Sequence, residues 1–283
     1  MKPAPFAYHR AFDIRGAVEL LAELGDDAKL LAGGQSLVAM MNFRLARPAA
    51  LVDLGRVDGL RHLQRDGAAL RIGALVTHHA VETAAGLSDG FGVLPRAARW
   101  IGHYPIRTRG TIGGSIAHAD PAAEWCLLAV LLDALIVAEG SQGSRTVPAS
   151  QFFHGFLTTA LRPDEVVIEV VFPKPAPHAA LAEFAQRKGD FAIVAAAVSL
   201  EVSGGVCGSA SVALGGVDAT PIRIPDAERV LAGGTPGPEL FAEAADVAAR
   251  VIEPGADAHG SADYRRTLTR TLLTRALQEA VTA

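Results

Sequence analysis

Thr111–Ser115 reads TIGGS, and an earlier stretch of the same kind, Ala32–Leu37, reads AGGQSL. Paired glycines allow the backbone to turn sharply and to come close to a ligand. Successive N–H groups in such a loop can form a nest for an anion, and the Gln and Ser side chains add neutral donors. A single Gly-Gly pair is usually an ordinary tight turn. Two loops of this kind favour two cradles of backbone amides that hold one diphosphate from both sides.

Neither loop matches the common nucleotide or nucleophile motifs. The spacing differs from Gly-x-Gly-x-x-Gly, so a Rossmann domain is not indicated. No Gly-Lys-Ser or Gly-Lys-Thr is present in either loop, so a P-loop ATPase is not indicated either. Ser36 lies in the string Gly-Gln-Ser-Leu-Val, which lacks the second glycine of a nucleophile elbow. The loops are therefore predicted to bind a ligand rather than to supply a nucleophile.

The composition fits two or three small subdomains that share a core. Half of the 283 residues are hydrophobic and the formal net charge is −4. Lys and Arg are scattered, so neither nucleic acid nor a membrane surface is indicated as a partner. The longest apolar run, near 126–137, is predicted to be a buried helix too short to span a bilayer. The first residues lack the pattern of a signal peptide, and a cytoplasmic protein is expected.

The two cysteines, Cys126 and Cys207, are far apart in the sequence. A disulfide framework or a structural zinc site is therefore not indicated. An iron–sulfur cluster normally needs four thiolates, so this chain alone cannot hold one. Any redox chemistry would require an organic cofactor or a partner.

The first 55 residues predict a helix, a strand, a loop, a second helix and another strand. Asp13 is suited to cap a helix that ends just before Gly25. Apolar strands are expected at 29–32 and 51–54, and a short helix at 37–41. We take residues 1–55 as a first subdomain.

From about residue 60 the pattern changes to hairpins and short helices. Asp66-Gly67 is a tight-turn signal between two strands, and Thr77 is suited to cap a helix. Asp120 followed by Pro121 predicts another helix start, with Asp at the cap and Pro at the first helical position. A helix is also expected at 95–101 and a strand at 166–172. Prolines at 173, 175 and 177 indicate a linker, which ends a second subdomain at 56–176.

The remaining residues, 177–283, hold three strand-like runs followed by helical patterns, the longest of them at 261–281. The strands are expected at 181–186, 191–202 and 206–214. A three-stranded antiparallel sheet packed on a helical bundle is the natural arrangement. The predicted fold class is therefore α+β.

The two glycine strings, extended to 31–38 and 109–124, closely resemble those of the FAD-binding subunits of molybdenum hydroxylases. That family includes the medium subunit of carbon monoxide dehydrogenase and the flavin domain of xanthine dehydrogenase. The resemblance also covers residues 5–8, 186–192 and 264–266, so it spans nearly the whole chain. It implies a two-part FAD-binding unit of the vanillyl-alcohol-oxidase type, followed by a domain of three strands and a helical bundle.

The resemblance also implies where FAD would be contacted. Both glycine loops are expected to hold the diphosphate, and His118 to lie near the flavin. Glu124 stands where relatives commonly carry Asp for the sugar-like chain, and it is one methylene longer. Phe191 stands where relatives place an aromatic ring against the isoalloxazine; Phe can stack there but cannot donate a hydrogen bond. The predicted cofactor-binding residues are Ala32, Gly33, Gly34, Gln35, Ser36, Leu37, Ile101, Thr111, Ile112, Gly113, Gly114, Ser115, His118, Glu124, Val167, Asp190 and Phe191.

Simpler structural explanations compete for three of these residues. Ile101 and Val167 would suit core positions on a helix and a strand. Phe191 would equally suit the core of a hairpin.

Other residues are expected to have structural roles. The adjacent His78 and His79 are interpreted as an exposed pair, and Trp100 and Trp125 as core residues on apolar helix faces. The arginines of the last helix, Arg265 among them, do not recur on one face and are interpreted as solvated or as part of a subunit contact.

The resemblance further implies an electron relay. A large molybdopterin-cofactor subunit would hydroxylate a small molecule with water as the oxygen source, and a small subunit with two 2Fe-2S clusters would pass electrons singly. FAD would hand them in pairs to an external acceptor, which is NAD, a quinone or oxygen. A dimer of heterotrimers is expected, and no side chain of this chain is assigned as a catalytic acid or base.

Three alternatives remain open on sequence grounds. The first is a stand-alone FAD-dependent oxidase or dehydrogenase of the same fold. The second is a metallohydrolase that uses His118, Asp120 and Glu124, although such sites usually need three convergent ligands and Asp120 is already explained as a helix cap. The third is a non-catalytic scaffold.

Overall fold

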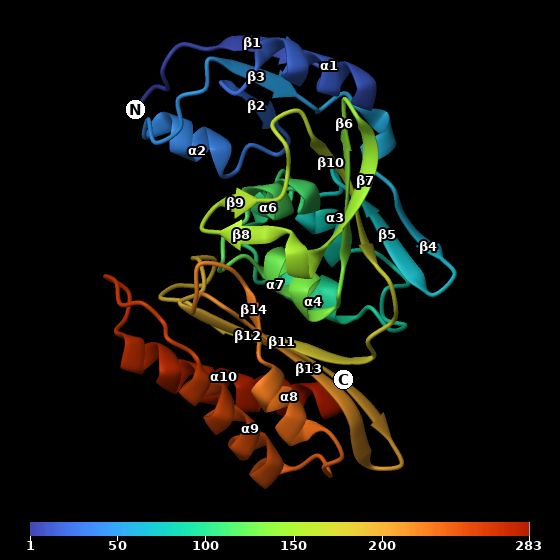
Figure 1. Cartoon of the computed structure of the whole chain (residues 1–283), viewed down its shortest axis with the longest axis vertical. Helices are drawn as coiled ribbons and strands as arrows, with labels where there is room; N and C mark the ends of the chain where they lie inside the picture. Colours follow the sequence, from blue (N-terminus) through green and yellow to red (C-terminus); the bar gives the residue numbers. More distant parts are fainter. Residues whose placement is uncertain (283) are drawn as a thin grey trace.

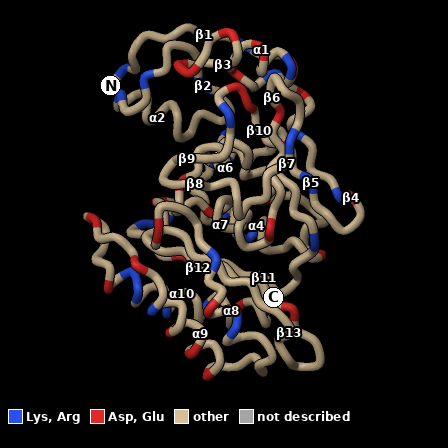
Figure 2. The backbone as a smooth tube through the Cα atoms, viewed as in Figure 1, with Lys and Arg blue, Asp and Glu red and all other residues tan. Residues whose placement is uncertain are grey.

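The computed structural model describes residues 1–282 and stacks them in three parts along the long axis of the molecule (Figure 1). The N-terminal part, drawn in blue, and the C-terminal part, drawn in orange and red, lie at opposite ends of the central part. Basic and acidic residues are interspersed along the backbone of all three parts (Figure 2), in agreement with the scattered charges of the sequence. Within residues 1–282, no helix combines the length and the apolarity needed to cross a membrane.

The N-terminal part is a parallel sheet in which the third strand lies between the first two. Parallel neighbours need a crossover connection, and the connection between the neighbouring second and third strands contains the short helix α2 (Leu37–Asn42). The first strand was not predicted, because its residues, Ala-Tyr-His-Arg, are mostly exposed and form no apolar run. The elements are β1 (Ala7–Arg10), α1 (Ile14–Leu24), β2 (Ala28–Leu31), α2 (Leu37–Asn42) and β3 (Ala50–Asp53).

The predicted limits of α1 are confirmed. Asp13 Oδ1 accepts a hydrogen bond from the backbone N–H of Gly16 at 2.7 Å, which satisfies one of the free amides of the first turn. Gly25 follows the last turn with a φ of 72°. The short helix α2 begins directly after the first paired-glycine stretch, as expected.

The central part is a five-stranded antiparallel sheet with the order β4-β5-β10-β6-β7. The hairpin at Asp66-Gly67 and the cap at Thr77 are confirmed, since the Thr77 side chain accepts from the N–H of Ala80 at 3.1 Å. The elements are η1 (Asp58–Leu60), β4 (Leu63–Asp66), β5 (Ala69–Gly73), α3 (His78–Glu82), α4 (Val93–Ala98), α5 (Tyr104–Arg107), α6 (Ile112–His118), α7 (Glu124–Leu131), β6 (Leu135–Gly140), β7 (Gly143–Pro148), η2 (Ala149–Gln151), β8 (Phe153–Gly155), β9 (Thr158–Thr159) and β10 (Val166–Phe172).

Two predictions about the central part are wrong. The apolar run near 126–137 is not one helix: α7 ends at Leu131, Asp133 takes a φ of 51°, and the chain continues as β6. Such a left-handed residue cannot continue a right-handed helix. Asp120 does not cap α7 either. Its side chain accepts from the N–H of Ala122 at 2.8 Å and forms a turn, so the helix starts only at Glu124.

The C-terminal part is a sheet of four strands, not three. The additional strand has only two residues, which is too short for any alternation of polar and apolar residues to reveal it. The second strand begins at Val194 instead of at residue 191. The elements are β11 (His178–Phe184), β12 (Val194–Ser203), β13 (Val206–Gly215), β14 (Ile222–Arg223), α8 (Pro225–Leu231), α9 (Pro238–Val251) and α10 (Ala262–Thr282).

The strand β12 joins the cores of the central and C-terminal parts. Ala195 and Ala197 are buried in the core that also contains α7, whereas Ala196 and Val198 are buried against the C-terminal helices. Alternate residues of a strand point to opposite faces, so the sheet is covered on both sides. Small alanines on this strand allow α7 to pack closely on one face and α10 on the other.

The prediction that the arginines of the last helix are solvated or part of a subunit contact is wrong for one of them. Arg265 is only 7% exposed, and it donates to the carbonyl of Gly216 at 2.7 Å and to the Asp257 carboxylate at 2.6 Å. A buried guanidinium requires such acceptors; Gly216 directly follows β13, and Asp257 lies between α9 and α10.

Candidate functional site

The two paired-glycine stretches lie against each other. We call residues 32–37 the first glycine loop and residues 109–115 the second glycine loop. A Cβ built on Gly33 would lie 2.1 Å from the carbonyl oxygen of Arg109, so only glycine permits this approach. A Cβ built on Gly114 would lie 3.7 Å from that of Ala32. Two segments that are distant in the sequence are thus brought to one place.

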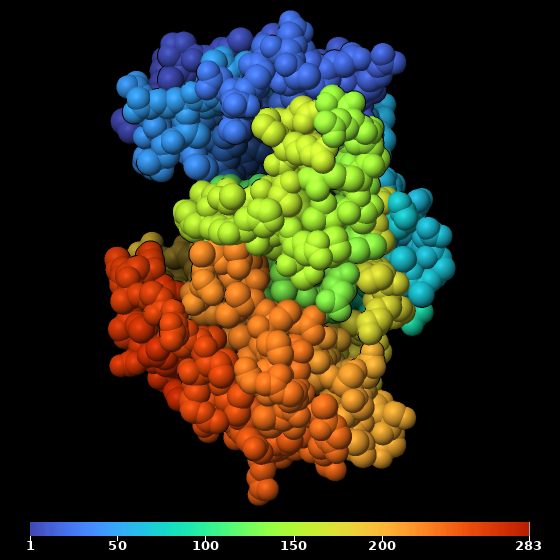
Figure 3. Space-filling view, viewed as in Figure 1, coloured from blue at the N-terminus to red at the C-terminus, as the bar shows by residue number. Residues whose placement is uncertain are grey.

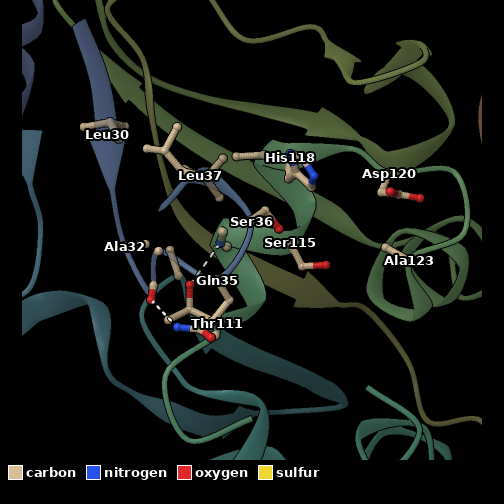
Figure 4. Close-up of a pocket in the computed structure, with 18 of the residues that line it drawn as sticks. Leu30, Ala32, Gln35, Ser36, Leu37, Thr111, Ser115, His118, Asp120 and Ala123 are labelled. Atoms are coloured by element: carbon tan, nitrogen blue, oxygen red, sulfur yellow. Dashed lines mark hydrogen bonds between the residues drawn. The ribbon is translucent and has the colours of Figure 1, made fainter. Parts of the chain in front are cut away.

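Both loops border a single cavity of about 700 Å³ between the N-terminal and central parts. This volume is typical of cavities that enclose a small molecule or a cofactor. Figure 3 shows the surface hollowed between the N-terminal part and the β8–β9 hairpin. In the close-up of Figure 4, Ser36 and Leu37 of the first loop border the same cavity as Ser115 and His118 of α6.

The cavity gathers nearly all the residues that the sequence singled out. Every predicted cofactor-binding residue lines it except Ile112, which is fully buried in the core of the central part. Ile112 is excluded because its side chain belongs to the hydrophobic core of the central part. The wall therefore combines the two glycine loops, the start of α7, one strand of the central sheet and the loop that holds Asp190 and Phe191.

The first glycine loop offers free backbone donors. Within residues 1–282, the N–H groups of Gly34, Gln35 and Ser36 donate to no protein acceptor. Ser36 precedes α2, but its side chain makes no capping hydrogen bond. Gln35 Nε2 donates to the carbonyl of Gly33 at 3.1 Å, which steadies the turn. Three adjacent amides without a partner can bind an anion.

The second glycine loop does not offer a second amide cradle, and that prediction is wrong. The N–H of Gly113 donates to the carbonyl of Ala74 at 3.0 Å, and the N–H of Gly114 donates to Thr111 Oγ1 at 3.1 Å. Gly113 also packs so tightly that a Cβ there would lie 2.4 Å from that of Ala74. What this loop presents to the cavity is instead the hydroxyl groups of Thr111 and Ser115.

The opposite end of the cavity is closed by the loop between β11 and β12. Phe191 lies in this loop, is 66% exposed and lines the cavity, so it is not the core residue of a hairpin. Gly189 has a φ of 89°, and a Cβ there would lie 2.5 Å from the ring of His103. Glycine at this position lets the loop lie against the stretch that follows α4.

Apolar residues form the wall near this loop. Ile101 is half-buried just after α4, and Val167 on β10 is both a core residue and part of the cavity wall. The stretch at 101–102 is held in place by Arg107, which donates to the carbonyl of Gly102 at 3.0 Å and pairs with Glu82 at 2.9 Å. The cavity therefore has a rigid apolar side.

A half-buried pair of carboxyl groups, on Glu124 and Glu183, lies where the central part meets the C-terminal sheet. Burial raises the pKa of Glu124, and the nearby charge of Glu183 raises it further. Burial also raises the pKa of Glu183, whose Oε2 has no hydrogen-bond partner within residues 1–282. The pair favours keeping a proton at neutral pH because two uncompensated buried carboxylates would repel each other.

The polar residues around α6 do not form a metal site. Burial lowers the pKa of His118, which the Asp120 charge partly opposes. Within residues 1–282, no three His, Cys, Asp or Glu side chains are arranged to hold a metal ion. The ligand set on which a metallohydrolase would depend is therefore not assembled.

Two aromatic predictions are wrong. His78 is buried, with 5% of its surface exposed, because Trp125 Nε1 donates to its Nδ1 at 2.9 Å. It also lines the cavity, which no local sequence signal indicated. Trp100 is 41% exposed, since α4 ends at Ala98 and Trp100 lies beyond the buried helix face. Trp125 is fully buried, as predicted.

Two family profiles match the chain, one after the other. The FAD binding domain in molybdopterin dehydrogenase matches residues 4–175, and the CO dehydrogenase flavoprotein C-terminal domain matches residues 179–280. Together they cover the three parts of the fold.

Relatives share the full length of the chain. The 6-hydroxypseudooxynicotine dehydrogenase complex subunit alpha of Paenarthrobacter nicotinovorans is 41% identical, over 99% of this chain and 96% of that protein. The carbon monoxide dehydrogenase medium chain of Hydrogenophaga pseudoflava is 36% identical, over 99% of this chain and 98% of that protein. A chain in the crystal structure of quinoline 2-oxidoreductase from Pseudomonas putida 86 superposes with a TM-score of 0.96 at 36% identity, covering 100% of this chain and 99% of that one.

These matches agree with the resemblance carried by the two glycine strings, and they extend over residues that those strings do not include. Profiles, sequence relatives and solved structures all point to the same kind of protein, an FAD-binding component of an oxidoreductase. The chain belongs to the family of FAD-binding medium subunits of molybdopterin-containing dehydrogenases and hydroxylases.

Proposed function

We propose that FAD occupies the cavity between the glycine loops, with its diphosphate at the first loop. The observation that carries this proposal is the set of three adjacent N–H groups, on Gly34, Gln35 and Ser36, that have no protein acceptor and lie on the cavity wall. The hydroxyls of Thr111 and Ser115 face the same space from the second loop. A cavity of about 700 Å³ with a few neutral donors on one side and apolar walls on the other suits a dinucleotide.

The protein's contribution is to position and shield the cofactor. Bound FAD supplies one- and two-electron chemistry, so it can connect single-electron clusters to a two-electron acceptor. Ile101 and Val167 exclude water from one side of the cavity, and Asp190 and Phe191 border it at the β11–β12 loop. Glu124, at the start of α7, adds a carboxyl group whose pKa is raised by burial and by the nearby Glu183.

We infer that the chain acts as an electron relay within a larger complex. Its relatives are named as medium chains or as subunits of complexes, which supports this role. A large molybdopterin subunit would hydroxylate the substrate, a small subunit with 2Fe-2S clusters would deliver electrons to FAD, and NAD, a quinone or oxygen would accept them. We expect a dimer of such heterotrimers.

The proposed domain organisation is based on the position of the cavity. Residues 1–55 and 56–176 would form the two halves of an FAD-binding unit of the vanillyl-alcohol-oxidase type, with the cavity between them. Residues 177–283 would form the C-terminal domain, which closes one end of the cavity through the loop after β11.

The placement of FAD can be tested by filling the cavity. Ala117 is an exposed residue of α6 on the cavity wall, so Ala117→Trp occupies the space without disturbing the core. We expect this variant to lose FAD affinity by about 100-fold or more, because a bulky ring and the cofactor compete for the same volume. FAD titration of the cofactor-free full chain measures the effect.

A matched control is Ala242→Trp, at an exposed alanine of α9 outside the cavity. It should bind FAD like the unmodified chain. Unchanged FAD affinity in the Ala117→Trp variant would contradict the proposed placement.

A further inference from the structure

His78 has an unusual environment for a residue on a cavity wall. It is the first residue of α3, it lies behind the second glycine loop, and its backbone N–H donates to the carbonyl of Gly110 at 3.0 Å. The side chain is 5% exposed, and a buried imidazole requires partners for its ring nitrogens. One nitrogen has such a partner, because Trp125 Nε1 donates to Nδ1 at 2.9 Å.

The bond from Trp125 determines where the imidazole proton lies. An indole N–H can only donate, so Nδ1 of His78 must accept and must be unprotonated. Burial lowers the pKa of His78 to about 4, and the positive charge of Arg107 acts in the same direction. The ring is therefore neutral at neutral pH and carries its single proton on Nε2.

The Nε2–H of His78 lies on the side of the ring toward Gly110, which also lines the cavity. It has no protein acceptor within residues 1–282. It is also not sealed inside the protein, since the fully buried side-chain atoms without a partner in these residues belong to Arg96, His178 and Glu183. The ring itself lines the cavity. A ligand that fills the cavity would exclude water from this donor, so an oxygen atom of that ligand would have to accept its hydrogen bond.

Gly110 keeps this donor accessible. A Cβ on Gly110 would lie 2.6 Å from Nε2 of His78 and 2.8 Å from its Cδ2. The ring edge and the glycine backbone can approach each other only because that atom is missing. The backbone amides of the second glycine loop are largely occupied, so the donor available beside this loop is the Nε2–H of His78 on α3.

We propose that His78 is a further cofactor-binding residue, whose Nε2–H donates a hydrogen bond to an oxygen atom of FAD beside the second glycine loop. Trp125 acts as a positioning residue that holds the imidazole in the donating tautomer. The proposal rests on the placement of FAD in this cavity. A neutral donor matches an oxygen acceptor there without adding a positive charge to the site.

Two substitutions separate the cavity donor from the contact with Trp125. In His78→Asn, the side-chain oxygen can still accept from Trp125, but the amide is too short to place a donor at the position of Nε2. In His78→Gln, the longer amide can present a donor near that position. We expect His78→Asn to weaken FAD binding by about tenfold, as for one lost hydrogen bond, and His78→Gln to restore most of the affinity.

The readouts are the FAD dissociation constant and the thermal midpoint of the cofactor-free full chain. The neighbouring His79 does not line the cavity, and His79→Asn should leave the FAD affinity unchanged. Unchanged FAD affinity in folded His78→Asn would overturn the proposal. So would a lowered thermal midpoint without a change in affinity, because that result assigns His78 a structural role only.

A measurement on the unmodified chain covers the case in which the variants do not fold. Nitrogen NMR of the imidazoles should show His78 protonated on Nε2 alone, and the Nε2–H signal should move when FAD is added. An Nε2–H signal that does not respond to FAD would overturn the proposal. The Ala117→Trp variant separates failure of the FAD placement from failure of the His78 proposal. If Ala117→Trp keeps its FAD affinity, FAD does not bind in this cavity. If Ala117→Trp loses FAD affinity but His78→Asn does not, FAD binds in the cavity and only the proposed hydrogen bond from His78 is rejected.

Discussion

The first and second glycine loops have nearly the same sequence pattern but use their backbone amides differently. In the first loop, Gly34, Gln35 and Ser36 have N–H groups without a protein acceptor. In the second loop, Gly113 and Gly114 donate to Ala74 and to Thr111. The first loop is thus equipped to bind an anion, and the second is part of the framework that supports the cavity.

The difference arises from where each loop sits in the fold. The first loop follows β2, an edge strand of the small parallel sheet, and within residues 1–282 no carbonyl accepts from its amides at positions 34–36. The second loop lies beside the residues that follow β5, since Gly113 donates to the carbonyl of Ala74 and Ile112 to that of Val76, both at 3.0 Å. A Gly-Gly pair therefore indicates that another group comes close to the backbone. Whether that group is a ligand or another segment of the chain depends on the elements that surround the loop.

The largest effect should come from the tightly packed glycine of the second loop. Gly113→Ala places a methyl group 2.4 Å from the Cβ of Ala74 and 2.7 Å from its Cα, where backbone must move. We expect a loss of about 3 kcal/mol in the free energy of unfolding. Urea unfolding of the cofactor-free chain measures it. An equally stable variant that only loses FAD affinity would assign this loop a binding role instead of a structural one.

The second loop should also make stability depend on pH through His78, which packs on Gly110. The pKa of His78 is about 4 in the folded chain and near its ordinary value of 6.5 when unfolded. The stabilisation is complete above pH 6.5 and is lost as the pH falls toward 4, because only the unfolded chain takes up the proton in this window. The loss amounts to roughly 3 kcal/mol at most.

This dependence is measured by comparing the unfolding free energies of the unmodified chain and His78→Asn between pH 7 and pH 4. The curve of the variant should be flatter. Parallel curves would show that His78 titrates normally in the folded chain.

A substitution in the first loop should change the FAD affinity rather than the stability of the chain. Ser36→Asp places a carboxylate beside the free amides, where it competes with a diphosphate by charge repulsion. At the same time it can cap α2, so the cofactor-free chain should not lose stability. We expect FAD affinity to fall about 30-fold, a free-energy change of about 2 kcal/mol.

The neutral Ser36→Asn variant is the matched control, since it offers a similar cap without the charge. It should bind FAD within about threefold of the unmodified chain. Equal affinity in the Asp and Asn variants would indicate that no phosphate lies near Ser36.

Much of this site could be predicted from the sequence. The apolar runs around the first loop placed β2, α2 and β3, and the resemblance named residues that nearly all line one cavity. These features are local, because short hydrophobic patterns and glycine pairs are visible in consecutive residues. The strand β1 was missed because its mostly exposed residues form no apolar run, and β14 because two residues carry too little pattern.

The features that were missed at the site depend on contacts between distant segments. The amides of the second loop are occupied by carbonyls at the end of β5, and His78 is buried by Trp125 on α7. Asp120 appeared to be a helix cap, but its carboxylate instead stabilises a turn before α7. No local rule shows which donor or acceptor another element will bring, so these roles emerge only from the fold.

The most direct test is hydrogen exchange of the backbone amides, measured by NMR on the full chain with and without FAD. The amides of Gly34, Gln35 and Ser36 should exchange rapidly in the cofactor-free chain and become protected when FAD binds. Those of Gly113 and Gly114 should be protected in both states. Amides of the first loop that stay exposed in the FAD-bound chain, while those of the second loop become protected only on binding, would contradict the assigned roles.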